Sequence, residues 1–224
     1  MSGTLPGTTR GVELVDRLAR DIREGVYHPR ERLIEVELCE RYGASRNAVR
    51  AALIELAALG LVEREANRGA RVRPVSIDEA IESAEVRFSL QAMCAGRAAT
   101  RVTDEDRREL TGLIAELRDA VENGDRARTA TANSEISRVI RRISGHTTAT
   151  RIIESLQAQT PLNHYPYQLP DRRFDSMHEY EDIVEAVVAG DEEAALAAAY
   201  RHRDNVLAAL RGIRDALAEE RAPE

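Results

Sequence analysis

The first 60 residues repeat hydrophobic positions at helical spacing and predict three short helices. One covers 12–24 and a second covers 35–42, after which Gly43 breaks the pattern. Ser45 then supplies a side-chain oxygen for the free N–H groups at the start of a third helix, as an N-cap does. Two helices joined by a glycine turn are typical of a helix-turn-helix.

The third helix has two different faces. Its hydrophobic stripe predicts contact with a core, whereas the polar residues near its N-terminus are of the kinds that read base edges in the major groove. The stripe consists of Val49, Ala52, Leu53 and Leu56, and the polar face consists of Arg46, Asn47 and Arg50.

Two short strand patterns follow this helix. They cover 61–65 and 70–75, on either side of a turn at Asn67, Arg68 and Gly69. We expect Gly69 to adopt a positive φ there and to approach a nucleic-acid backbone closely. A two-stranded hairpin after a helix-turn-helix predicts a winged helix-turn-helix.

The pattern from residue 77 onward contains only long helical segments. A proline-containing loop, TPLNHYPYQLP, separates the fourth of these helices from the fifth. The fold class is therefore mainly α, with the winged helix-turn-helix followed by an all-α bundle. The predicted helices cover 77–101, 107–122, 125–144, 146–159, 173–189 and 191–218.

The charge divides along the chain in the same way. The net charge is −7, but residues 1–75 hold 13 Arg against 11 Asp and Glu, whereas the remainder holds 19 Arg against 28 acids. Only the nearby charge matters to a phosphate backbone, since salt screens distant charges. We therefore expect an N-terminal domain over 11–75 that binds DNA and an acidic domain over 76–219, with tails at 1–10 and 220–224.

Two sets of residues carry a resemblance to a known family. The run HPRERLIEVELCERYGASRNAVRAALIELAALGLV, followed by RGARV, resembles the N-terminal domain of the GntR superfamily of bacterial transcription regulators. Arg30 stands where that family usually has Gly, Ala48 where it has Pro, and Ala51 where it has Glu. The runs VRFSLQ, NSEISRVIRRISG and EAVVAGDEEAA, with His202 after them, resemble the FCD effector domain of its FadR-type branch.

The resemblance implies a metal site that this chain only partly keeps. The family uses an Asp, a His four residues later and two further His, and these positions here are Asn133, Ser137, Tyr180 and His202. Because only His202 is a usual ligand, we expect no metal cofactor. Zinc or another divalent metal held through His202 stays open.

Without a metal, the pocket has to recognise its effector by direct hydrogen bonds. Arg87, Arg138 and His202 suit an anionic group such as an organic acid, and Asn133, Ser137 and Tyr180 add neutral donors and acceptors. Three alternatives remain open. The two arginines only pair with acidic neighbours such as Glu135, His202 is a buried structural residue, or the pocket binds an uncharged molecule.

These observations together predict a regulator that binds double-stranded DNA. Its DNA contacts are expected at Ser45, Arg46, Asn47 and Arg50, at Arg68 and Gly69 of the wing, and at Arg32; any single Arg could instead be a solvated surface residue. We expect a homodimer on a palindromic operator, a repressor controlled by a small-molecule effector, without catalysis and without a membrane partner. Two widely separated cysteines favour the reducing bacterial cytoplasm.

Two other classes of function remain open. One is an effector-blind DNA-binding dimer with a degenerate pocket. The other is a metal-assisted hydrolase at His202 or at His178 with Glu181 and Asp182, although no complete set of nucleophile, base and orienting group is visible.

Overall fold

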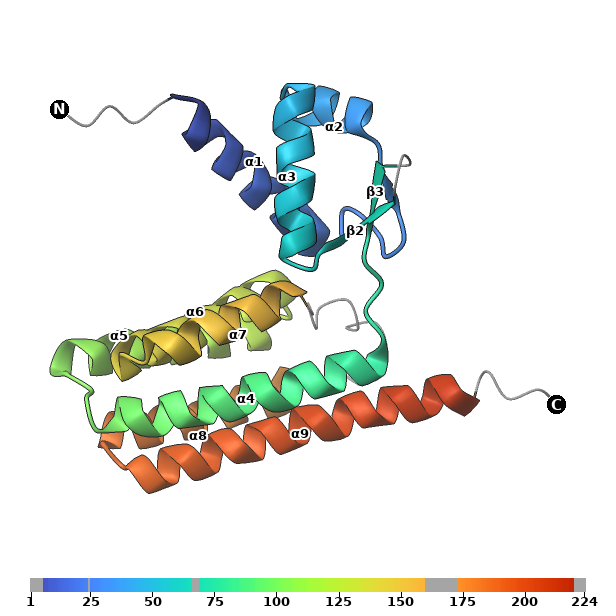
Figure 1. Ribbon diagram of the computed structural model, residues 1–224. Helices are drawn as coiled ribbons and strands as arrows, with labels where there is room; N and C mark the ends of the chain where they lie inside the picture. Colours follow the sequence, from blue (N-terminus) through green and yellow to red (C-terminus); the bar gives the residue numbers. More distant parts are fainter. Residues whose placement is uncertain (1–5, 24, 66–68, 160–172, 220–224) are drawn as a thin grey trace. The chain divides into compact units, whose positions relative to one another are not determined.

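The computed structural model describes residues 6–23, 25–65, 69–159 and 173–219 (Figure 1). It divides into two compact units. The first contains Met1–Ser76 and a segment that begins at Ser155, and the second contains Ile77–Glu154 and the chain from Gln168 onward. None of the described helices is long and apolar enough to cross a bilayer.

The first unit contains three helices and a small sheet among its described residues. The first helix begins at Pro6 and therefore includes the second half of the tail expected over 1–10. Proline is favoured in the first helical turn because its missing N–H has no partner there. The elements are α1 (Pro6–Arg23), β1 (Arg32–Leu33), α2 (Glu35–Tyr42), α3 (Arg46–Ala58), β2 (Val62–Glu65) and β3 (Gly69–Val72).

The turn between α2 and α3 forms as the sequence predicted. Gly43 follows α2 with φ +62°, and its neighbour Ala44 donates its N–H to the carbonyl of Cys39 at 3.1 Å. The Ser45 side chain then accepts a hydrogen bond from the Ala48 N–H at 3.3 Å, which confirms it as the N-cap of α3.

The predicted pair of strands forms as β2 and β3, and a third strand that was not predicted, β1, joins the sheet beside β3. All neighbours are antiparallel and the order is β1-β3-β2, with Arg32 opposite Arg71 and Glu63 opposite the same residue on the other side. The sequence gives no sign of β1 because two residues are too few to display alternation.

Arg30 occupies a backbone conformation that normally requires glycine. The Glu31 N–H donates to the His28 carbonyl at 3.0 Å, with Pro29 and Arg30 between them and Arg30 at φ +69°. A turn with Pro at its second position and a positive φ at its third is a type II turn. This explains physically why the related family usually has Gly at this place.

The second unit is a helical bundle, as predicted. In the part of the chain that the structure describes, α4 packs along α9, α8 packs on α9, and α5 packs against α6 and α8 (Figure 1). Its helices are α4 (Ile77–Ala99), α5 (Asp104–Glu122), α6 (Arg126–Ser144), α7 (Thr147–Gln159) as far as Glu154, α8 (Arg173–Ala189) and α9 (Glu192–Glu219).

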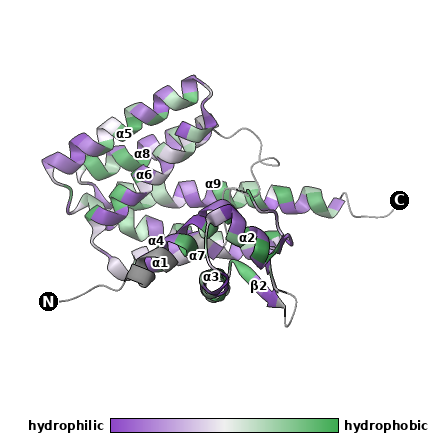
Figure 2. Cartoon of the chain, turned by 90° about the horizontal axis from the view of Figure 1, so that it is seen from above, coloured by the Kyte–Doolittle hydropathy of each residue, from purple (hydrophilic) through white to green (hydrophobic). Residues whose placement is uncertain are grey.

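Small residues allow α4 and α9 to approach closely. A Cβ on Gly96 of α4 would lie 2.6 Å from Cγ of Leu196 on α9, so this contact depends on glycine. Hydrophobic and hydrophilic residues alternate along α9, as an amphipathic helix requires (Figure 2). The buried core of the bundle includes Ala92, Leu110, Leu117, Ile136, Val139, Val187 and Ala195.

Candidate DNA interface and effector pocket

The exposed face of α3 carries the polar residues that the sequence assigned to DNA. Ser45, Arg46, Asn47 and Arg50 are all exposed. The opposite side of the same helix is buried, with Val49 and Leu56 fully enclosed in the core of the first unit. The helix is thus fixed to its own unit by one face and presents two guanidiniums and an amide on another.

Arg50 has a partner within the protein. Its Nε lies 2.9 Å from Oε2 of Glu35 on α2, and its side chain is 62% exposed. An exposed pair of this kind contributes less than about 1 kcal/mol to stability. The guanidinium can therefore exchange Glu35 for another anion at small cost.

The small sheet also carries an exposed arginine on its first strand. Arg32 on β1 is exposed and lies opposite Arg71 in the sheet, where Arg71 forms an ion pair of 2.9 Å with Glu63. Gly69 has φ +90°, which confirms the conformation expected of it. Arg68 belongs to residues 66–68 and lies outside the described residues.

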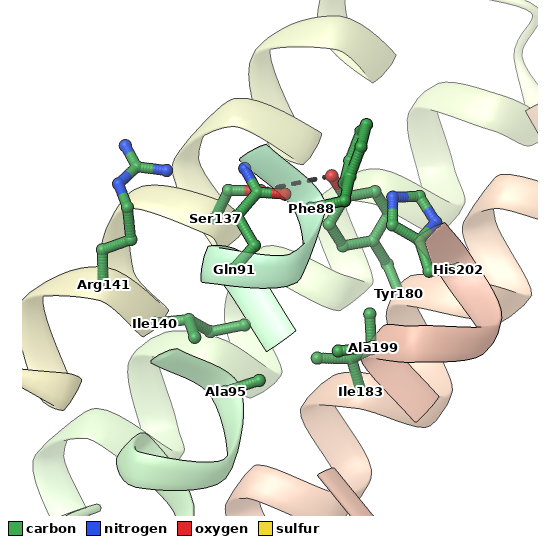
Figure 3. A pocket seen from close by; sticks show the side chains of 10 residues that line it. All are labelled: Phe88, Gln91, Ala95, Ser137, Ile140, Arg141, Tyr180, Ile183, Ala199 and His202. Carbon is green, nitrogen blue, oxygen red and sulfur yellow. Dashed lines mark hydrogen bonds between the residues drawn. The ribbon is translucent and has the colours of Figure 1, made fainter. Parts of the chain in front are cut away.

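A small cavity lies inside the second unit, where α4, α6, α8 and α9 meet. It brings together three of the six predicted effector residues, Ser137, Tyr180 and His202 (Figure 3). The Ser137 hydroxyl and the Tyr180 hydroxyl lie 3.2 Å apart, and the rings of Tyr180 and His202 have centroids 5.0 Å apart. Its volume is about 30 Å³. That space holds about one or two water molecules.

His202 is buried with a carboxylate that the sequence analysis did not single out. Its Nδ1 lies 2.6 Å from Oε2 of Glu179, and only 8% of the His202 side chain is exposed. The other oxygen of Glu179 accepts a hydrogen bond of 2.8 Å from the Asn205 amide. Because Glu179 holds the imidazole, the structure agrees with the alternative of a buried, satisfied histidine.

Neither Arg87 nor Asn133 lines the cavity. Arg87 is 7% exposed, its guanidinium carbon lies 4.6 Å from the centre of the Phe88 ring, and its Nε has no hydrogen-bond partner among the described residues. Burial lowers the pKa of Arg87 to about 10, so it remains charged at neutral pH. Asn133 likewise has a buried Oδ1 without a partner in the described part of the chain.

Arg138 does not face this cavity. It is exposed and pairs with Glu135 on its own helix at 2.7 Å, which is the alternative that the sequence left open. The arginine that does line the cavity is Arg141, one helical turn after Ser137. The spacing of four residues places both on one face of α6 and could have identified it from the sequence.

The donor set does not fit a metal ion. Of the four family positions only His202 is a usual ligand, and its Nδ1 is bonded to Glu179. Burial raises the pKa of the Tyr180 phenol, which therefore stays neutral. No group of three His, Cys, Asp or Glu suited to a metal occurs among the described residues. A divalent ion would need more than one imidazole and one carboxylate.

The alternative hydrolytic site at His178 lies on the surface. The His178 side chain is 68% exposed and its Nδ1 lies 3.0 Å from Oε2 of Glu181, which also pairs with Arg118. Asp182 pairs instead with Arg201 at 3.3 Å. The predicted loop with His164 falls outside the described residues.

Comparison with known proteins agrees with this architecture. The family model described as "Bacterial regulatory proteins, gntR family" matches residues 11–72, and the FCD domain model matches residues 82–205. The two models together therefore cover the first unit and most of the second.

Two relatives and one solved structure extend the match over most of the chain. The chain is 29% identical over 203 residues to the "Probable D-xylose utilization operon transcriptional repressor" of Paenarthrobacter nicotinovorans, covering 90% of this chain and 88% of that protein. It is 27% identical over 198 residues to the HTH-type transcriptional regulator McbR of Escherichia coli K12, covering 84% and 90%. The solved structure of E. coli McbR/YncC has the same fold, with a TM-score of 0.79, 24% identity and coverage of 91% and 97%.

These relatives are transcription regulators and not enzymes, which excludes the hydrolase alternative. The chain belongs to the GntR family of bacterial regulatory proteins, in the branch with a C-terminal FCD domain, and is a DNA-binding transcription regulator.

Proposed function

We propose that the protein is a homodimeric repressor whose α3 helices read two half-sites of a palindromic operator. The exposure of Arg46, Asn47 and Arg50 on one face of α3, opposite a buried hydrophobic stripe, carries this proposal. Arginine can grip a guanine edge with two hydrogen bonds and asparagine can grip adenine in the same way. One short helix reads few bases, and pairing two copies doubles the site.

In this proposal the wing and β1 contact the DNA backbone. Gly69, with its positive φ, allows close approach of the main chain, and Arg32 adds an exposed cation opposite Arg71 on the same strand β3. Arg68 is assigned to the same contact from the sequence alone. Repression is inferred because one relative over most of the chain is named a repressor.

We infer further that a small organic acid binds beside the cavity of the second unit and changes operator affinity. The support is Arg87, a buried guanidinium whose Nε has no partner among the described residues. The unpaired Oδ1 of Asn133 is an acceptor and suits a hydroxyl group of such an acid, not its carboxylate. A buried donor without a partner is costly unless a ligand satisfies it. Because the cavity holds only about 30 Å³, such a ligand has to displace a side chain. An effector then acts by binding two states with different affinity.

The same small volume favours a second candidate, an effector-blind DNA-binding dimer. Its pocket would serve only packing and dimerisation. The two candidates differ in one measurable property, because a ligand that prefers the folded state raises the melting temperature.

One experiment tests both parts of the proposal. Genomic fragments are captured with the purified protein, and the enriched operator is titrated with and without each of a panel of organic acids. The proposal expects a palindromic footprint and at least one acid that raises the melting temperature and shifts operator affinity. Arg87→Met should bind the operator normally and lose this response. A footprint with no acid active in either assay would establish the effector-blind alternative.

A further inference from the structure

An open cleft lies in the second unit where α6 ends and α7 begins. It has a volume of about 340 Å³. This is within the range of sites that hold small molecules, whereas the central cavity is about a tenth of the size. The cleft is lined by Arg138, Arg141, Arg142, Gly145, His146, Thr147, Thr150, Arg151 and Glu154.

Arg141 connects this cleft with the central cavity, because it lines both. It is only 7% exposed, and neither its Nε nor its Nη1 has a hydrogen-bond partner among the described residues. In Figure 3 its guanidinium points away from Tyr180 and His202. Leaving charged N–H groups buried and unpaired is costly, so this arrangement is expected where a bound anion completes it.

The charges around the cleft leave an excess of positive charge. Arg142 pairs with Asp106 and Glu109 at 2.7 Å each, and Arg138 pairs with Glu135, so these two are largely neutralised. Arg151 is exposed and forms no ion pair in the described part of the chain. The lining therefore offers two guanidiniums without an ion pair in the described part of the chain, those of Arg141 and Arg151. Against them stands the single carboxylate of Glu154, which attracts Arg141 electrostatically but makes no hydrogen bond to its Nε or Nη1.

The start of α7 adds neutral donors to the same cleft. The His146 Nδ1 accepts the N–H of Ala149 at 3.2 Å and so caps the helix. Thr147 and Thr150 line the cleft, and the Thr150 N–H donates to the His146 carbonyl at 3.0 Å. The N–H groups of Thr147 and Thr148 are then the ones that helix geometry leaves without a partner within α7. Helix N-termini with such groups favour phosphate.

We propose that this cleft binds the phosphoryl group of a small phosphate or phosphate ester, with Arg141 as its buried anchor. A carboxylate is planar and is satisfied by one guanidinium, whereas a phosphoryl group carries more acceptor oxygens and takes donors from several sides. Here the donors come from α6, from the first turn of α7 and from Arg151. The site shares Arg141 with the wall of the central cavity but does not include Arg87, and it does not depend on the proposed function.

The test is titration calorimetry of the full chain with inorganic phosphate and, separately, with glycerol 3-phosphate. Ionic strength is held constant with chloride, and glycerol serves as the uncharged control. Saturable binding of either anion, with about one site per chain, is expected. Equal affinity for the two identifies free phosphate as sufficient, and tighter binding of the ester identifies a phosphate ester; both outcomes support the site.

Two variants and one control locate the binding. Arg141→Met should weaken binding at least about tenfold without lowering the melting temperature, because it removes a buried unpaired charge. If Arg141 had only a structural role, its replacement by Met would lower the melting temperature. Arg151→Gln, at an exposed position, should weaken binding by a smaller factor. Its affinity for phosphate tests the site if Arg141→Met does not fold. The control is Arg126→Met, at the other end of α6 and exposed, which should change the affinity less than about twofold.

Three results would overturn the proposal. One is the absence of saturable binding to the wild-type chain. A second is equal binding by wild type and Arg141→Met. The third is competition for the site by a non-operator DNA duplex at equal phosphate concentration, which would place the cleft in the DNA interface. None of these results depends on whether an organic acid controls operator binding.

Discussion

The Nε of Arg50 on α3 lies 2.9 Å from Oε2 of Glu35 on α2, so a guanidinium proposed to contact DNA is held by a carboxylate in the free protein. A carboxylate at this place both occupies the arginine and repels the phosphate backbone. Arg50 therefore has to break its ion pair with Glu35 before it contacts the operator, and the free energy of that pair is subtracted from the free energy of binding.

Glu35→Gln should therefore tighten operator binding. The gain is limited to the strength of an exposed pair, up to about 1 kcal/mol, which corresponds to about fivefold in affinity. Fluorescence anisotropy with a labelled operator measures it. Glu37→Gln on the same helix removes an exposed carboxylate without an assigned partner and should have a smaller effect. Weaker binding by Glu35→Gln would mean that Glu35 orients Arg50 for the DNA.

Arg30→Gly should stabilise the first unit. A non-glycine residue in the left-handed region destabilises the fold by about 1–2 kcal/mol. Glycine removes this strain, but it loses more backbone freedom on folding, which offsets about 0.5–1 kcal/mol of the gain. The net expectation is a gain of about 1 kcal/mol in the free energy of unfolding, measured by urea denaturation. Arg32→Gly, within β1, should instead destabilise the unit. A loss of stability in Arg30→Gly would show that its side chain contributes more than its backbone costs.

Asp106 should make stability depend on acidity. Its Oδ2 accepts the N–H of Thr103 at 3.0 Å, and the Thr103 Oγ1 accepts the N–H of Asp106 at 3.2 Å, so the two form a capping box at the start of α5. The hydrogen bond with the Thr103 side chain holds the pKa of Asp106 below its ordinary 3.8. A lowered pKa means that the stabilisation is complete above pH 3.8 and is lost as the pH falls through the value in the folded state.

Asp106→Ala should cost about 1 kcal/mol of stability at pH 7. The difference from wild type should shrink as the pH is lowered from 5 toward 3 and below, because the wild-type carboxyl then becomes protonated. Urea unfolding at several pH values measures this difference. Asp104→Ala is the matched control, since that carboxylate lies in the same first turn but is 94% exposed. A difference that stays constant with pH would contradict the assignment.

Local signals allowed most of the fold to be predicted from the sequence. The spacing of hydrophobic residues located the helices, and Gly43 and Ser45 marked the turn that precedes α3. The strand β1 was missed because it consists of Arg32 and Leu33 alone, and its pairing with β3 depends on contacts distant in sequence. Short non-local pairings leave little trace in a local pattern.

The pocket was predicted less well than the DNA interface. Residues on α3 act side by side on one helix, so their spacing alone shows that they share a face. The pocket combines four helices, and the partner of His202 proved to be Glu179, a contact that only the packing of α8 on α9 creates. Arg138 was predicted because its charge suits an anionic ligand, whereas the packing of α6 places Arg141 in the cavity wall and leaves Arg138 paired with Glu135.

The most direct test of the account measures operator affinity as a function of salt for wild type, Arg46→Ala, Arg50→Ala and the distant control Arg126→Ala. Each lost phosphate contact should lower the slope of log affinity against log salt by about 1, and a lost base contact should cost about 1–3 kcal/mol. We predict that both α3 variants bind at least about fivefold more weakly and that the control matches wild type. Equal affinity of all four proteins across the salt range would contradict the reading of DNA by this face of α3.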